Sequence, residues 1–103
     1  MAENDIPNLS PKEFIAMNLL VGSKAMYGLQ MVEKSNGELK RGTIYLTLHR
    51  LEEKGYVTSE TEEAKPGIAQ PRRLYKPSAL GVRVFHALHK VGGGNWLKEV
   101  FAS

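Results

Sequence analysis

Apolar residues in the segment 40–54 recur at helical spacing, which predicts an amphipathic helix there. Ile44, Leu48 and Leu51 fall on one face, at positions i, i+4 and i+7. The opposite face is mostly polar and carries Leu46, His49, Arg50 and Glu53. Gly55 follows, and glycine commonly ends a helix in the left-handed conformation. One side of such a helix can rest on a core while the other enters a DNA groove, although an ordinary solvent-facing helix has the same pattern.

A capping box opens a predicted helix over residues 10–21. Ser10 suits the cap position, Pro11 the first helical position and Glu13 the third. The rest of this segment is apolar enough to be largely buried, and Gly22 is expected to end the helix.

A second helix is predicted over residues 25–34, with Leu29 and Val32 on its inner side. Residues 35–37, Ser-Asn-Gly, form a clear turn before the helix at 40–54. Two helices joined by a short turn that contains glycine, the second of them basic at its start, are typical of a helix-turn-helix.

The pattern then changes to strands. Residues 56–61 are rich in strand formers, and residues 72–76 are expected to return alongside them. Between them, residues 62–71 contain two prolines and a glycine and are expected to form a loop. Ser78 is expected to cap a further helix whose apolar seam consists of Leu80, Val84, Leu88 and Val91. Three glycines at 92–94 interrupt this helix, and a last short helix is expected after them.

This order predicts an α+β fold that is mainly α: a winged helix-turn-helix with three helices, a β-hairpin wing and a C-terminal helical segment. We expect an N-terminal arm over residues 1–9 and the winged helix-turn-helix domain over residues 10–77. Residues 78–103 are expected to form the C-terminal helical segment and to dimerise. A chain of 103 residues has room for one small domain.

The composition is that of a soluble globular protein, with 42% hydrophobic and 24% charged residues. The absence of cysteine excludes disulfides and thiolate chemistry. No apolar run approaches the roughly 20 residues that span a bilayer, and the acidic N-terminus does not resemble a signal peptide. We therefore expect a cytoplasmic protein without membrane contact. The net charge of +3 is compatible with nucleic-acid binding.

Catalytic groupings are not found in the sequence. No paired carboxylates, activated nucleophile or phosphate-binding glycine loop stands in a suitable context, so we expect neither enzyme activity nor a cofactor. His86 and His89 have a spacing that could share a metal ion, but no third ligand is in view. Packing or surface roles are therefore expected for both, and no metal site.

Five short motifs resemble the signature of the PadR-like transcriptional regulators, in the same order along the chain. They are Tyr27-Gly28, Gly42-Thr43-Ile44-Tyr45, the stretch from Leu48 to Val57, Arg72-Arg73-Leu74-Tyr75 and Ser78-Ala79-Leu80-Gly81. The chain departs from the family at Leu46, where proline is common, and at Pro77, where leucine is usual. Three glycines also cut the region that usually forms a long dimerising helix. The resemblance implies DNA binding without catalysis, by a homodimer with one reading helix in each of two successive major grooves.

Ten residues are the candidate contacts to double-stranded DNA. Base edges or sugars are expected to meet Thr43, Leu46, His49 and Arg50. Phosphates are expected to meet Lys40, Arg41 and Tyr45, and by family analogy Tyr27. The wing contributes Arg72 and Arg73, for a neighbouring minor groove or its phosphates.

Each of these assignments has a purely structural alternative. Arg50 has the spacing for an ion pair with Glu53 on the helix surface. The ring of Tyr45 can be buried against the second helix while its hydroxyl stays polar. Arg72 and Arg73 can instead protect a hairpin edge from aggregation.

The end of the chain carries a group of large apolar residues that water does not favour. With the preceding helix, it supplies the candidate dimer contacts Leu88, Val91, Trp96, Leu97, Val100 and Phe101. Packing back onto the chain's own first helix is the alternative. A pocket for a small aromatic effector between the subunits is suggested only by the resemblance.

The leading hypothesis is a sequence-specific, homodimeric DNA-binding repressor, with response to a ligand as an option. The alternative is a winged helix that serves as a protein-interaction module without direct DNA readout. Its anchor would be Trp96, Leu97 and Phe101, and acidic residues near the wing give it some support.

Overall fold

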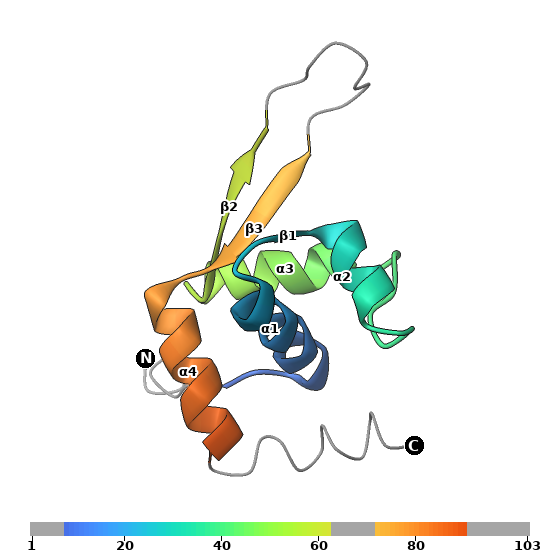
Figure 1. Cartoon of the computed structure of the whole chain (residues 1–103). Helices are drawn as coiled ribbons and strands as arrows, with labels where there is room; N and C mark the ends of the chain where they lie inside the picture. The colour runs from blue at the N-terminus through green and yellow to red at the C-terminus, as the bar shows by residue number, and fades with distance from the viewer. Residues whose placement is uncertain (1–7, 63–71, 91–103) are drawn as a thin grey trace.

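The computed structural model describes residues 8–62 and 72–90, and its element order is that of a winged helix-turn-helix. Three helices come first, a β-hairpin follows, and a further helix completes the described chain (Figure 1). The elements are α1 (Pro11–Ser23), β1 (Met26–Tyr27), α2 (Gly28–Lys34), α3 (Ile44–Glu53), β2 (Val57–Thr61), β3 (Arg73–Pro77) and α4 (Ala79–Leu88). The predicted fold class, α+β and mainly α, is confirmed.

Both predicted helix caps are present. The Ser10 hydroxyl accepts from the backbone N–H of Glu13 at 3.2 Å, and the Glu13 carboxylate accepts from the backbone N–H of Ser10 at 2.8 Å. At the start of α4, the Ser78 hydroxyl accepts from the N–H of Gly81 at 2.9 Å. These local bonds satisfy N–H groups that the first turn of a helix leaves unpaired.

The end of α3 lies where the sequence predicts it, whereas the end of α1 does not. Gly55 has a φ of 82°, the left-handed conformation expected after α3. Gly22 does not end α1 as predicted, because the helix continues to Ser23. Lys24 instead takes the left-handed position with a φ of 75°, and its N–H bonds the Leu20 carbonyl at 2.7 Å.

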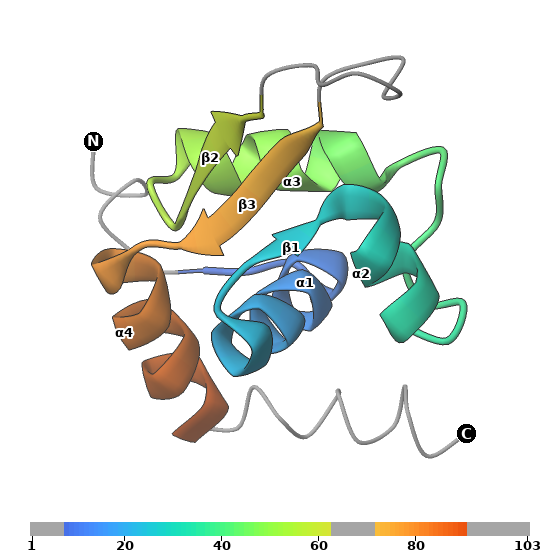
Figure 2. The ribbon, with the colours of Figure 1, turned by 45° about the horizontal axis from the view of Figure 1, so that its top comes forward.

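The sheet has a third strand that the sequence pattern did not predict. Its order is β1-β3-β2, with antiparallel neighbours throughout (Figure 2). Met26 pairs with Tyr75 and Tyr27 with Leu74, so residues 26–27 belong to a strand and not to the predicted helix. The reason is tertiary: β3 supplies hydrogen-bond partners to this short segment from almost 50 residues away in sequence.

Two predicted inward positions are wrong, Leu29 and Leu80, whereas Val32, Val84 and Leu88 pack on the core as predicted. Leu29 is 44% exposed, whereas Met31 is fully buried, because residues 26–27 are extended in β1 and the helix after them turns another face to the core. Leu80 is also 44% exposed and does not join the inner seam of α4. The inward position next to it is Gly81, where an added Cβ would lie 2.0 Å from the Tyr56 carbonyl oxygen. This backbone contact sets the rotation of α4.

The core lies around α1, which packs against α2, α3, α4 and β3 (Figure 1). Its completely or almost completely buried side chains include Phe14, Ile15, Met17, Leu20, Met31, Leu39, Ile44, Leu48 and Leu51. Tyr75 and Val57 extend this core onto the hairpin. The hairpin is therefore anchored at its base by the same core that holds the helices.

Glu13 is a charged group inside this structure, with a side chain only 4% exposed. Its carboxylate accepts a hydrogen bond from the Lys54 ammonium at 2.6 Å. Lys54 also donates to the side-chain oxygen of Asn8 at 3.0 Å. The end of α3 is thereby tied to the beginning of α1.

Neither His86 nor His89 belongs to a metal-binding group among the residues described, where no three potential metal-binding His, Asp or Glu side chains gather. The His89 ring is stacked at 6.3 Å from that of Phe14 and lies 5.8 Å from that of Phe85. Within the described ranges, every helix lacks the length and apolar character needed to cross a membrane.

Candidate nucleic-acid interface

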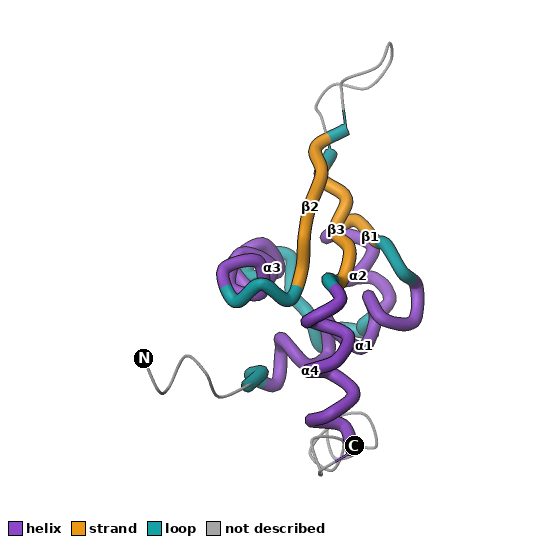
Figure 3. Tube along the Cα trace, turned by 90° about the vertical axis from the view of Figure 1, so that its left-hand side faces the viewer, coloured by secondary structure: helices purple, strands orange, loops and turns teal. Residues whose placement is uncertain are grey.

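The two faces of α3 are divided as the sequence predicts. Ile44, Leu48 and Leu51 are at most 1% exposed and rest on the core. The opposite face, which we call the α3 front, is open to solvent and consists of Thr43, Leu46, His49 and Arg50. Figure 3 shows α3 at one edge of the molecule, with the hairpin extending beyond the helices. This arrangement gives the helix an uncovered side that a groove of duplex DNA can receive.

Arg50 does not form the ion pair with Glu53 that was its structural alternative. Glu53 lies instead 3.6 Å from the His49 ring nitrogen, one turn before it on the same helix. Within residues 8–62 and 72–90, the Arg50 guanidinium has no ion pair or side-chain hydrogen bond. Its planar group of donors is therefore available to a ligand that accepts two hydrogen bonds.

Lys40 and Arg41 lie in a turn before α3 and not in its first helical turn. The N–H of Ile44 bonds the Lys40 carbonyl at 2.9 Å, and both basic side chains are exposed. The N-terminal end of a helix carries partial positive charge, so two cations there repel it slightly. A phosphate bound at this end would relieve that repulsion and pair with both cations.

The ring of Tyr45 packs against α2, as its structural alternative predicted, and its phosphate contact stays a prediction. Its ring contacts the first residue of α2, since a Cβ added to Gly28 would lie 2.8 Å from the Tyr45 ring. The side chain is nevertheless 49% exposed. The ring packs against α2 while the hydroxyl stays accessible to a polar ligand.

Arg73 is connected to α3 through a short hydrogen-bond chain. It donates to the Ser59 hydroxyl at 3.0 Å, and Ser59 donates to the Glu52 carboxylate at 2.6 Å. Ser59 and Glu52 were not among the predicted site residues. Alternation along β2 places Ser59 on the α3 side, but the bond across to Glu52 depends on how the hairpin folds back.

Arg72 and Tyr27 form a second cluster with Glu62, on the outer side of the sheet. The Arg72 guanidinium carbon lies 4.4 Å from the centre of the Tyr27 ring, a cation–π distance. The Tyr27 hydroxyl donates to the Glu62 carboxylate at 2.7 Å, and this bond, with smaller effects of burial and charge, raises the pKa of Tyr27. Glu62 was not among the predicted site residues. The register of the hairpin places Glu62 beside Arg72, since the Glu62 backbone N–H donates to the Arg72 carbonyl at 2.7 Å.

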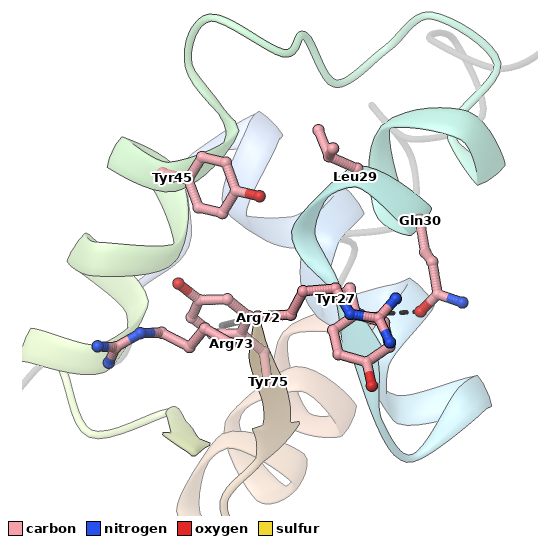
Figure 4. A pocket seen from close by; sticks show the side chains of 7 residues that line it. All are labelled: Tyr27, Leu29, Gln30, Tyr45, Arg72, Arg73 and Tyr75. Atoms are coloured by element: carbon pink, nitrogen blue, oxygen red, sulfur yellow. Dashed lines mark hydrogen bonds between the residues drawn. The ribbon is translucent and has the colours of Figure 1, made fainter. Parts of the chain in front are cut away.

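A cavity of about 500 Å³ lies between the start of α2, the first turn of α3 and β3. Figure 4 shows Leu29 and Tyr45 on one side of it and the side chains of β3 on the other. Its lining residues are Tyr27, Leu29, Gln30, Tyr45, Arg72, Arg73 and Tyr75. Four of the ten candidate DNA contacts thus meet in one concave region.

Most of the expected dimer contacts fall outside the residues that the structure describes, namely Val91, Trp96, Leu97, Val100 and Phe101. Leu88 is described, and it is half-buried and packed against the core.

The family model described as "Transcriptional regulator PadR-like family" matches residues 17–87, most of the chain. The chain belongs to this family. Its members are transcription regulators and not enzymes, and the shared region includes α2, α3 and the whole hairpin. This PadR-like protein is therefore a DNA-binding transcriptional regulator. No curated protein sequence is significantly similar to it.

Solved structures share its fold. A PadR family transcription regulator from Clostridium difficile has a TM-score of 0.67 at 22% identity, over 90% of this chain and 96% of that one. A PadR-like transcription factor from Bacteroides fragilis has 0.67 at 24% identity, over 87% and 85%. A mutant MarR from Escherichia coli, complexed with operator DNA, has 0.66 at 16% identity, over 89% and 61%.

Proposed function

We propose that this PadR-like protein is a homodimeric repressor that reads an operator through the α3 front. Two copies of α3 enter successive major grooves, about 34 Å apart, on a near-palindromic site. The observation that carries this proposal is the exposed α3 front above a fully buried apolar stripe. The similar MarR structure, which contains operator DNA, supports duplex DNA as the partner.

The ten candidate residues fall into two roles. Arg50 suits a bidentate contact to guanine and Leu46, 52% exposed, an apolar contact to a thymine methyl group. Lys40, Arg41 and the wing arginines suit phosphates, which fix the register without reading sequence. Repression follows if the operator overlaps the site that RNA polymerase needs.

The decisive experiment is a gel-shift titration of the full chain against the promoter of its own operon. A double charge reversal, Lys40→Glu with Arg41→Glu, should reduce the affinity at least about a hundredfold at moderate salt, because it replaces two phosphate contacts by repulsion. The matched control is Lys24→Glu with Arg83→Glu, two exposed cations at the end of α1 and on α4. The control should bind almost as well as the unchanged protein.

The same variants separate DNA binding from the alternative, a winged helix that only binds proteins. An apolar protein interface would survive the reversal at Lys40 and Arg41. Absent binding, or binding that does not weaken as salt rises, would contradict the proposal. Expression of a reporter under the same promoter tests repression, since deletion of the regulator should raise it.

We propose that a small aromatic effector regulates this protein, and that it binds in the cavity beside α3 and not between the subunits, where the family resemblance suggested it. The cavity beside α3 supports it, because a volume of about 500 Å³ and three tyrosine rings suit a ligand of that size. An effector there would contact Tyr45 and disturb the adjacent DNA contacts. Benzoate is a suitable probe: it should release labelled DNA from the unchanged protein, and failure to do so up to millimolar levels would remove benzoate-like acids from the proposal.

A further inference from the structure

The Glu62 carboxylate contacts both candidate phosphate-binding side chains on the outer side of the sheet, Tyr27 and Arg72. Its Oε2 accepts the hydroxyl proton of Tyr27 at 2.7 Å, and its Oε1 lies 3.8 Å from Nη2 of Arg72. The guanidinium in turn lies over the Tyr27 ring at 4.4 Å. Three residues thus form one closed cluster: one from β1, the residue just after β2 and the residue just before β3.

The chemistry of this cluster is that of a bound phosphate. A tyrosine hydroxyl and an arginine guanidinium are donors that phosphate oxygens accept, and a carboxylate presents the same charge and two similar oxygens. A tyrosine hydroxyl is protonated at neutral pH, and the hydrogen bond to Glu62 raises the pKa of Tyr27 further, so the hydroxyl donates to the anion. The cluster therefore already holds an anion, and that anion is part of the chain.

The ion pair between Arg72 and Glu62 is exposed enough for a phosphate to replace the carboxylate. The Arg72 side chain is 56% exposed and that of Glu62 is 39% exposed, and ion pairs with this exposure add little to stability. Arg72 and Tyr27 also line the cavity that reaches Tyr45 in the first turn of α3. A DNA backbone lying along α3 would approach the same two donors.

We infer that Glu62 is an internal competitor of DNA: its carboxylate holds Tyr27 and Arg72 in the free protein, and a backbone phosphate must displace it. The inference rests on the proposed DNA-binding function. It makes the wing contact conditional, because Arg72 contributes to affinity only after its intramolecular partner has left. Neutralising Glu62 should strengthen binding, which is the opposite of what loss of a DNA-contacting residue does.

Glu60, in β2, provides a matched control close to Glu62. It lies two residues before Glu62, and its carboxylate pairs with Lys76 at 3.0 Å with a side chain that is 71% exposed. Glu60→Gln and Glu62→Gln each remove one negative charge with little change in shape. They differ in the cation released, since Lys76 is not a candidate DNA contact and Arg72 is.

The test is a fluorescence-anisotropy titration of the full chain with a labelled duplex of about 30 base pairs that contains the promoter fragment, over a series of salt concentrations. Glu62→Gln should bind about fivefold more tightly than the unchanged protein at low salt, because no ion pair is broken and no carboxylate is left unpaired when Arg72 contacts a phosphate. The slope of log affinity against log salt should become steeper by about one. Glu60→Gln should change affinity less than about twofold.

The same substitution in a variant without the released donors tests whether the gain in affinity depends on them. In Arg72→Ala with Tyr27→Phe, which lacks both donors that Glu62 holds, adding Glu62→Gln should no longer tighten binding. Tighter binding that persists there, or an equal gain in Glu60→Gln, would show a general charge effect and overturn the inference. Weaker binding by Glu62→Gln would mean that Glu62 orients Arg72 for DNA, and would overturn it as well.

The outcomes also separate the inference from the function on which it rests. If the unchanged protein binds DNA and Glu62→Gln does not improve it, only the internal competition is wrong. If neither the unchanged protein nor any variant binds duplex DNA, the proposed function fails and the inference fails with it. Binding that is detectable only in Glu62→Gln would support both.

Discussion

At the scale of single residues, Gly81 determines how closely α4 approaches the turn after α3. An added Cβ would lie 2.0 Å from the backbone oxygen of Tyr56, which cannot move aside as a flexible side chain could. We expect Gly81→Ala to lower the free energy of unfolding by about 3 kcal/mol, the upper range for overpacking in a core. Urea denaturation measures this change.

Gly22→Ala is the matched control, because no atom lies within 4 Å of the added Cβ and the position is helical. Alanine there should be neutral or should stabilise by up to about 1 kcal/mol. Equal stability of the two alanine variants would show that the approach of α4 to Tyr56 is not constrained as described.

Tyr75 makes the stability depend on alkaline pH. Burial, and then the negative charge of Glu52, raise its pKa above the ordinary 10.0. The unfolded chain therefore releases this proton at lower pH than the folded chain does. The resulting stability is complete below pH 10 and is lost as pH rises through the folded pKa.

Tyr75→Phe should therefore lose less stability between pH 9 and pH 11 than the unchanged protein. Urea denaturation at several pH values measures the difference, and effects common to both proteins cancel in it. Parallel losses in the two proteins would contradict a perturbed Tyr75.

At the scale of elements, local signals predicted starts and turns well. The capping box at Ser10, the cap at Ser78 and the left-handed Gly55 all depend on neighbours within four residues, and all three are present. The buried stripe of α3 was also predicted, since a period of 3.6 residues is visible without knowledge of the rest of the fold. The exposed α3 front could be derived from the same pattern.

The features that could not be predicted depend on partners far away in sequence. β1 exists because β3 offers it hydrogen bonds, and the pairing shifts the start of α2 to Gly28. The rotation of α4 follows from a backbone contact at Gly81. Glu62 joins the candidate site through the hairpin register and its bond to Tyr27, 35 residues earlier. Such contacts leave no periodic trace in the sequence.

The contact between α2 and α3 can be tested at Gly28. An added Cβ would meet the Tyr45 ring at 2.8 Å, and the ring is a half-exposed side chain that can move. We expect Gly28→Ala to fold normally but to bind promoter DNA about threefold to tenfold more weakly, because Tyr45 no longer holds its position for a phosphate. Anisotropy titration measures the affinity and thermal unfolding the fold, with Gly22→Ala as control. Unchanged affinity would remove Tyr45 from the interface.

At the scale of the whole molecule, reading a near-palindromic operator requires two copies of α3. We expect sedimentation equilibrium to give twice the 11.5 kDa of one chain at micromolar concentration. Trp96→Ala with Phe101→Ala, which removes two of the proposed apolar contacts, should shift the protein towards the monomer and weaken promoter binding more than it weakens binding to a half-site. A monomeric unchanged protein would leave one reading helix per particle and contradict the proposed dimer.

The junction between the hairpin and α4 has a geometric consequence for such a dimer. The Ser78 hydroxyl bonds the Gly55 carbonyl at 2.6 Å and its N–H bonds the Tyr56 carbonyl at 2.9 Å, so α4 departs from the point where α3 has just ended. If the two copies meet through α4 and the residues after it, these hydrogen bonds fix the direction of α4 relative to α3. They therefore set the distance between the two α3 helices of the dimer. The number of base pairs between the two half-sites of an operator would then depend on residues that do not contact DNA.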